Sequence, residues 1–197
     1  MDSHLRGRIP FVSALETLQE AREDRIVVTS MGATREWTRL PEHPLDFHFV
    51  PSTMGGAPAL GLGLALAQPQ REVIALSGDG SLLMSLGSLV TIAAAGATNL
   101  TLIVLVNGIY EVTGRQKTAA IEADADYAAL ARASGITSVV QFEQIDAWKE
   151  GVSAALAAPG PRVIVLAVEP VAGDYRLSVP GPMQERLAQF RAALAGP

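Results

Sequence analysis

The sequence contains no cysteine among its 197 residues, and this absence removes several kinds of chemistry at once. Disulfides, thiolate zinc sites, cysteine-ligated iron–sulfur clusters and a cysteine nucleophile are all excluded. An excess of positive charge is absent too, because 15 Lys and Arg stand against 20 Asp and Glu. The resulting formal charge of −5 argues against a protein that binds nucleic acid through a basic face.

Long apolar runs are also missing. The richest stretches, 57–67 and 100–106, are well short of the roughly 20 residues that a membrane-spanning helix needs. Residues 1–18 lack the apolar core of a signal peptide, so we expect a soluble, cytoplasmic protein. Because 49% of the residues are hydrophobic, we predict a packed core, and the length favours one domain over 1–197.

Short β-branched runs alternate with longer Ala- and Leu-rich stretches along the whole chain. Strands are predicted at 25–29, 46–50, 72–77, 100–106, 137–140 and 162–168. Helices are predicted at 11–21, 34–40, 55–67, 81–96, 127–133, 144–157 and 183–194. This alternation predicts an α/β fold, a doubly wound, six-stranded and mostly parallel sheet with helices on both faces. Ligands of such sheets bind at the C-terminal ends of the strands, so the loops there are the candidate site.

The motif Gly78-Asp79-Gly80-Ser81 directly follows the third predicted strand. The glycines permit a tight turn, the N–H groups of Gly80 and Ser81 suit a phosphate, and Asp79 offers the oxygen ligand that Mg²⁺ prefers. Alone, the motif is more typical of a strand-to-helix turn capped by the aspartate. A dinucleotide-binding pattern is not met, because Leu83 stands at the third glycine position.

A second polar motif, Asn107-Gly108-Ile109, follows the next predicted strand. The 26 residues between Gly80 and Asn107 suffice for one helix and one strand. Adjacent parallel strands bring their C-terminal ends together, so Asp79 and Asn107 can share one cation. The pairing of the two motifs therefore favours a metal and phosphate site over an isolated turn.

These two motifs, in this order, resemble the diphosphate-binding domain of thiamine-diphosphate enzymes. The resemblance extends upstream to 51–56 and 61–65, and it covers about 25–168. Val106-Asn107 stands at the family's usual Asn-Asn pair, and the second, metal-ligating asparagine is kept. The resemblance implies thiamine diphosphate with Mg²⁺ held by Asp79, Asn107 and the main-chain carbonyl of Ile109.

The resemblance also implies how the organic part of the cofactor is held. Met54 occupies the position of the bulky side chain that bends the two cofactor rings into a V; the alternative is an ordinary pocket wall. The carbonyl of Ser52 and the N–H of Met54 are implied contacts of the pyrimidine, while Thr34 is nearly as well suited to cap a helix. The full set of implied cofactor contacts is Gly32, Thr34, Ser52, Thr53, Met54, Gly78, Asp79, Gly80, Ser81, Asn107, Ile109 and Tyr110.

Within the family, segments 78–91 and 107–116 most resemble the small, beta subunit of sulfopyruvate decarboxylase and the matching part of phosphonopyruvate decarboxylase. Those enzymes remove CO₂ from pyruvates with an acidic group on the third carbon. Thr113-Gly114-Arg115-Gln116 carries the match, whereas Lys117 replaces an expected proline and 111–112 departs from the pattern. A carboligase of acetolactate-synthase or benzaldehyde-lyase type shares every motif and stays open, as does a non-catalytic thiamine-diphosphate-binding module.

One essential part of the family's active site has no counterpart in this sequence. The glutamate that activates the cofactor belongs to a pyrimidine-binding domain, and no segment resembles that domain. Glu16, Glu20 and Glu23 lie on a predicted solvent face, and His43 and His48 are weaker acid–base candidates because one lies between prolines and the other in a strand. We therefore expect half of an active site, completed by a pyrimidine-binding subunit, and an oligomer that packs through 55–67.

Overall fold

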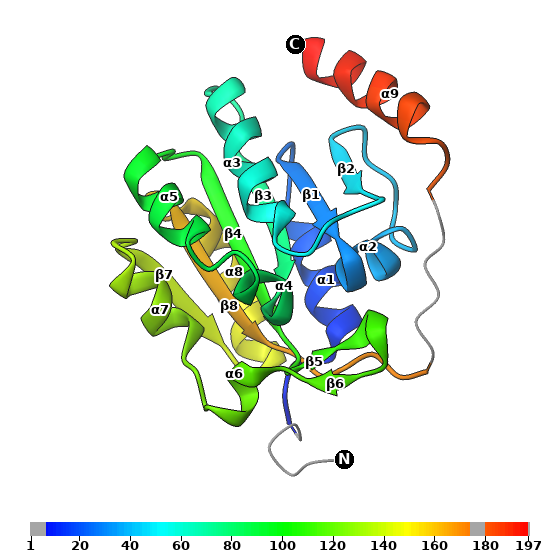
Figure 1. Cartoon of the computed structure of the whole chain (residues 1–197). Helices are drawn as coiled ribbons and strands as arrows, with labels where there is room; N and C mark the ends of the chain where they lie inside the picture. Colours follow the sequence, from blue (N-terminus) through cyan, green and yellow to red (C-terminus); the bar gives the residue numbers. More distant parts are fainter. Residues whose placement is uncertain (1–6, 174–179, 197) are drawn as a thin grey trace.

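The computed structural model describes residues 7–173 and 180–196 and contains the predicted parallel sheet. Six strands follow the order β2-β1-β3-β4-β8-β7, and every neighbouring pair is parallel (Figure 1). Their bounds are β1 (Ile26–Ser30), β2 (Asp46–Phe49), β3 (Val73–Gly78), β4 (Leu100–Val106), β7 (Ser138–Phe142) and β8 (Arg162–Ala167). The sheet confirms the predicted α/β class.

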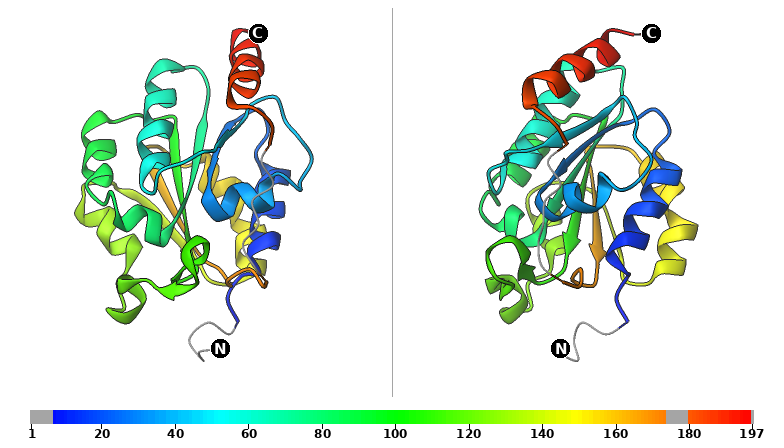
Figure 2. Two further views of the ribbon diagram at one scale, coloured as in Figure 1. Left: turned by 45° about the vertical axis from the view of Figure 1, so that its right-hand side comes forward. Right: turned by 90° about the vertical axis from the view of Figure 1, so that its right-hand side faces the viewer.

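Helices cover both faces of the sheet, as the right-hand view of Figure 2 shows. One face carries α1 (Phe11–Ala21), α2 (Met31–Trp37) and α8 (Ile145–Ala157). The other carries α3 (Gly56–Ala67), α5 (Ser88–Ala95) and α7 (Tyr127–Ala133). The central strand β4 is buried up to its last residue, which explains why the run at 100–106 is apolar apart from Thr101.

A C-terminal helix, α9 (Met183–Ala195), covers the edge strand β2. The rings of Phe47 and Phe190 lie 5.1 Å apart, and the Arg186 guanidinium donates to the carbonyls of His48 and Val50, each at 2.5 Å. The helix thus supplies hydrogen-bond donors to an edge that no further strand of the described chain covers. Among the described residues, no helix has the length and apolarity to cross a membrane.

Three local predictions differ from the structure. The predicted helix at 81–96 is two helices, α4 (Asp79–Leu83) and α5, separated by a turn at 84–87 that contains Gly87. The helix predicted at 34–40 begins earlier, at Met31, whose φ of 51° is left-handed. The polar loop after β4 forms a hairpin of β5 (Ile109–Tyr110) and β6 (Gln116–Lys117), with a 3-10 turn at Glu111–Thr113 and then α6 (Ala119–Glu122). Two-residue strands are too short to show a period in the sequence.

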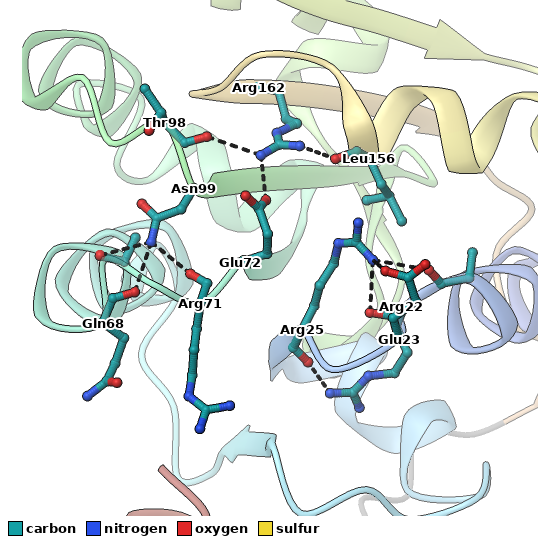
Figure 3. Close-up of polar contacts among 12 residues, drawn as sticks. Arg22, Glu23, Arg25, Gln68, Arg71, Glu72, Thr98, Asn99, Leu156 and Arg162 are labelled. Carbon is teal, nitrogen blue, oxygen red and sulfur yellow. Dashed lines mark hydrogen bonds and ion pairs between the residues drawn. The ribbon is translucent and has the colours of Figure 1, made fainter. Parts of the chain in front are cut away.

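A polar cluster ties elements together at the N-terminal ends of the strands, away from the candidate loops (Figure 3). The buried Arg162 guanidinium donates to the carbonyls of Leu156 and Thr98 and pairs with Glu72. The Asn99 side-chain amide donates to three carbonyls that follow or end α3, those of Ala65 (3.0 Å), Gln68 (3.1 Å) and Arg71 (2.8 Å). These bonds satisfy carbonyls that lack helical partners.

Replacing Asn99 by Ala is therefore expected to lower the free energy of unfolding by about 1–3 kcal/mol, because it removes the donor from partly buried carbonyls. Urea unfolding measures the loss, and the exposed Gln70→Ala serves as the matched control. Equal midpoints for the Asn99 and Gln70 variants would show that water replaces the amide at no cost.

Candidate functional site

A cavity of about 210 Å³ lies at the C-terminal ends of β1, β3 and β4, where the sequence predicts the site. Nine of the twelve predicted contact residues line it, all except Thr34, Ser52 and Thr53. The complete lining is Phe11, Met31, Gly32, Ala33, Met54, Gly78, Asp79, Gly80, Ser81, Leu105, Asn107, Ile109, Tyr110, Glu111, Val112 and Thr113.

Asp79 places a buried carboxylate in this cavity. It is the first residue of α4 and is 2% exposed, and its Oδ2 accepts the Gly108 N–H at 3.0 Å. Burial raises the pKa of Asp79 to about 6, although the N–H groups of Gly80 and Gly108 oppose the rise. The ion pairs found among the described residues do not include Asp79. A carboxylate in this state is suited to a cation.

Asn107 lies beside Asp79, as the order of the strands predicts. Gly78 pairs with Leu105 across β3 and β4, so the two strands end together. The N–H of Ile109 donates to Asn107 Oδ1 at 3.1 Å, while the preceding N–H, of Gly108, donates to Asp79. Two consecutive backbone donors therefore hold the two side-chain oxygens at one turn.

The backbone of Ile109 completes this set of oxygens. The Thr118 N–H donates to the Gly108 carbonyl at 2.9 Å, so Ile109 and Lys117 form a non-hydrogen-bonded pair of the hairpin. The Ile109 carbonyl consequently faces away from β6, on the side of its own N–H and of Asn107. One carboxylate, one amide and one main-chain carbonyl oxygen form a donor set that fits Mg²⁺. The described residues contain no cluster of three His, Asp or Glu side chains that offers an alternative metal site.

Two glycines keep the floor of the cavity free of side chains. A Cβ on Gly80 would lie 2.4 Å from the Tyr110 ring, and one on Gly32 would lie 2.9 Å from Glu111 Oε2. A larger residue at either position would therefore have to displace the Tyr110 or Glu111 side chain. A floor of this kind fits a diphosphate group, which backbone N–H groups bind closely.

The segment between β2 and α3 brings only one of its predicted side chains to the cavity. Met54 lines it, whereas Ser52 is half-buried and Thr53 is exposed, and neither lines the cavity. The contact implied for Ser52 is made by its main-chain carbonyl and not by its side chain, so that contact stays a prediction.

Thr34 is fully buried inside α2 rather than at its N-cap, which is Ser30. Its Oγ1 lies 3.0 Å from Thr29 Oγ1, and Thr29 Oγ1 lies 2.9 Å from His48 Nδ1. The hydroxyl is thus engaged in an internal chain of hydrogen bonds. Neither His43 nor His48 lines the cavity, and the three glutamates 16, 20 and 23 are exposed, as predicted.

Sequence reasoning missed a buried charged network that borders the cavity. Glu111 is 9% exposed; its Oε1 accepts the Val171 N–H at 2.9 Å, and its Oε2 lies 3.6 Å from the Arg35 guanidinium. Arg35 also pairs with Glu36 at 2.5 Å, and both are 3% exposed. The only signal for this network in the sequence was that 111–112 departs from the family pattern. The adjacent Arg35 and Glu36 gave no signal, because charged residues in a short helix usually face solvent.

Comparisons with known proteins agree with this geometry. The family model for the thiamine pyrophosphate enzyme C-terminal TPP-binding domain matches residues 27–166. The chain is 38% identical over 161 residues to phosphonopyruvate decarboxylase of Streptomyces viridochromogenes, covering 81% of this chain and 40% of that protein. It is 37% identical over 164 residues to sulfopyruvate decarboxylase subunit beta of Methanothermobacter thermautotrophicus, covering 83% and 84% of the two chains.

A solved structure from Mycobacterium smegmatis, described as a candidate thiamin diphosphate-dependent enzyme, superposes with a TM-score of 0.68 at 26% identity. The superposition covers 83% of this chain and 32% of that one. The fold and the site thus define a diphosphate-binding α/β domain. The chain belongs to the thiamine pyrophosphate enzyme family, and residues 27–166 match the C-terminal, TPP-binding domain of that family. It spans about 40% of the length of the phosphonopyruvate decarboxylases that it matches.

Proposed function

We propose that this chain is the thiamine-diphosphate- and Mg²⁺-binding subunit of a two-chain 2-oxo acid decarboxylase acting on an acidic 3-substituted pyruvate. The observation that carries the proposal is the buried Asp79 carboxylate set beside Asn107 in a TPP-binding domain. The two-chain arrangement is supported by the match to most of a sulfopyruvate decarboxylase beta subunit. The acidic substrate is supported by the names of the relatives, one a phosphonopyruvate and the other a sulfopyruvate decarboxylase.

When bound, thiamine diphosphate supplies an electron sink for the cleavage of a bond next to a carbonyl. The chain's residues supply the geometry. Asp79, Asn107 and the Ile109 carbonyl would hold Mg²⁺, and the backbone from Gly78 to Ser81 would bind the diphosphate. Met54 lines the same cavity and would support the organic part of the cofactor.

The carboxylates of the cavity support the proposal of a partner subunit. Among the described lining residues only Asp79 and Glu111 are acidic, and Glu111 is already bonded to Arg35 and to the Val171 N–H. In this proposal the activating glutamate comes from a second subunit. We place its docking surface on α3, α4 and α5, because 56–67 and 80–98 contain no Asp, Glu, Lys or Arg and expose three large side chains, Leu66, Met84 and Val90.

Substrate choice is tested by assaying CO₂ release from a panel of 2-oxo acids by the complex with the partner subunit. We expect kcat/KM for sulfopyruvate or phosphonopyruvate to exceed that for pyruvate at least tenfold, since the acidic group adds binding energy. A preference for pyruvate, together with a ligated product in place of the free aldehyde, would favour a carboligase instead, because CO₂ is released in both reactions.

Replacing Met54 by Ala is expected to impair catalysis more than binding. The change leaves the metal and diphosphate contacts intact, so calorimetry should show cofactor affinity only modestly weakened. Exchange of the C2 hydrogen of the bound cofactor, measured in the complex with the partner subunit, should slow at least tenfold because proton transfer needs close approach. Met54→Leu, similar in volume, is the control and should keep most of the exchange rate. Equal exchange in the Ala variant and the wild type would make Met54 only a wall residue.

A further inference from the structure

The peptide units on both sides of Gly55 are held by two serines, Ser81 at the end of the Asp79 motif and Ser85 four residues beyond it. The Gly55 N–H donates to Ser81 Oγ at 2.8 Å, and Ser85 Oγ donates to the Gly55 carbonyl at 2.8 Å. Gly55 directly follows Met54, so the first of these bonds fixes the peptide plane that joins Met54 to Gly55. The second fixes the next plane, so the backbone that directly follows Met54 is held on both sides of Gly55.

This contact requires both a glycine and a break in the helix. Gly55 has a φ of +83°, and a Cβ there would lie 2.8 Å from both Cβ and Oγ of Ser85. Ser85 lies in the turn between α4 and α5, outside either helix, and is half-buried. The interruption of the predicted 81–96 helix is thus the feature that brings the Ser85 hydroxyl to Gly55.

We infer that Ser85 is a positioning residue that, together with Ser81, sets Met54 in a fixed place relative to the metal ligands. Ser81 and Asp79 belong to the same short helix, so the hydrogen bond that the Gly55 N–H donates to Ser81 joins the segment of Met54 to the helix of Asp79. Ser85 adds a second attachment on the far side of Gly55. The functional meaning of this arrangement rests on the proposed function, because that proposal gives Met54 its role beneath the cofactor.

The test uses the full chain labelled with ¹³C-methyl methionine, which contains five methionines. The Met54 methyl signal is assigned with Met54→Leu, and spectra of the wild type, Ser85→Ala and Ser88→Ala are compared. Ser88 is the matched control, because its buried hydroxyl has no hydrogen-bond partner in the part of the chain that the structure describes. Ser85→Ala is expected to shift or broaden the Met54 methyl, while the Met31 and Met183 signals and the Ser88→Ala spectrum stay unchanged. Met84 adjoins the mutated residue and is left out of the comparison.

An unchanged Met54 signal in Ser85→Ala would overturn the inference. Equal changes at Met54, Met31 and Met183 would also overturn it, because they would indicate general loosening rather than a local attachment. Calorimetry with thiamine diphosphate and Mg²⁺ then distinguishes a wrong role for Ser85 from a wrong proposed function. Affinity in Ser85→Ala should stay within about threefold of the wild type, which is below 1 kcal/mol. A wild-type chain that binds no cofactor would contradict the proposed function while leaving the Met54 result to stand on its own.

Discussion

Replacing Asp79 by Asn is expected to weaken Mg²⁺-dependent binding of thiamine diphosphate at least tenfold, or about 1.4 kcal/mol. The change removes the only charged ligand of the proposed site while keeping an oxygen for the Gly108 N–H. Calorimetric titration with the cofactor and Mg²⁺ measures the loss. Asp146→Asn, at an exposed carboxylate at the start of α8, is the matched control. Unchanged affinity in the Asp79 variant would disprove the metal site.

The same substitution, Asp79→Asn, should weaken cofactor binding but raise the free energy of unfolding of the metal-free protein. The folded-state pKa of Asp79, raised to about 6 by burial, lies above the ordinary value of 3.8. The unfolded chain therefore loses the proton first, and the free energy of unfolding falls as the pH rises from about 4 to about 6. Above that range the ionised carboxylate costs about 3 kcal/mol, which Asp79→Asn removes.

Thermal unfolding at about pH 7.5, with and without Mg²⁺, tests this reversal. Without metal the Asp79→Asn variant should unfold at the higher temperature, and Mg²⁺ with cofactor should raise the midpoint of the wild type more than that of the variant. Metal binding by the wild type should itself weaken below a pH of about 6, because protons compete for the carboxylate. If the wild type is more stable than Asp79→Asn without metal, a group other than a metal ion must stabilise the ionised Asp79 carboxylate.

The purified chain alone, saturated with thiamine diphosphate and Mg²⁺, is expected to release no measurable CO₂ from any 2-oxo acid. Both carboxylates of its cavity are committed, Asp79 to the proposed metal and Glu111 to the Arg35 network. Phosphonopyruvate decarboxylase of Streptomyces viridochromogenes, assayed on phosphonopyruvate, serves as the positive control. Robust turnover by the isolated chain would place the complete active site within it or within a homo-oligomer, and would end the two-subunit proposal.

The fold could be predicted because its signals are local and periodic. The run at 100–106 is apolar on both faces and became the central strand β4, while α1 and α7 begin and end where their patterns do. The positions of Asp79 and Asn107 followed from strand adjacency alone. These features require no knowledge of side-chain packing.

The missed features all depend on contacts between distant residues. Ser85 bonds a carbonyl 30 positions away, and Glu111 bonds a backbone N–H 60 positions away. The Thr34 hydroxyl is engaged by Thr29 because α2 begins three residues earlier than its pattern indicates. No periodicity in the sequence encodes such pairings, and only the folded arrangement reveals which hydroxyls and carboxylates are already engaged.

The packing of α9 against the edge strand β2 protects the protein from aggregation. Without Arg186 and Phe190, the carbonyls of His48 and Val50 and the ring of Phe47 would lie open along a sheet edge. An open edge of this kind is a template for pairing with another chain, which leads to aggregates rather than to a specific complex. Truncation before α9 should therefore turn a dispersed protein into one that precipitates, even though no residue of the cofactor cavity has been touched.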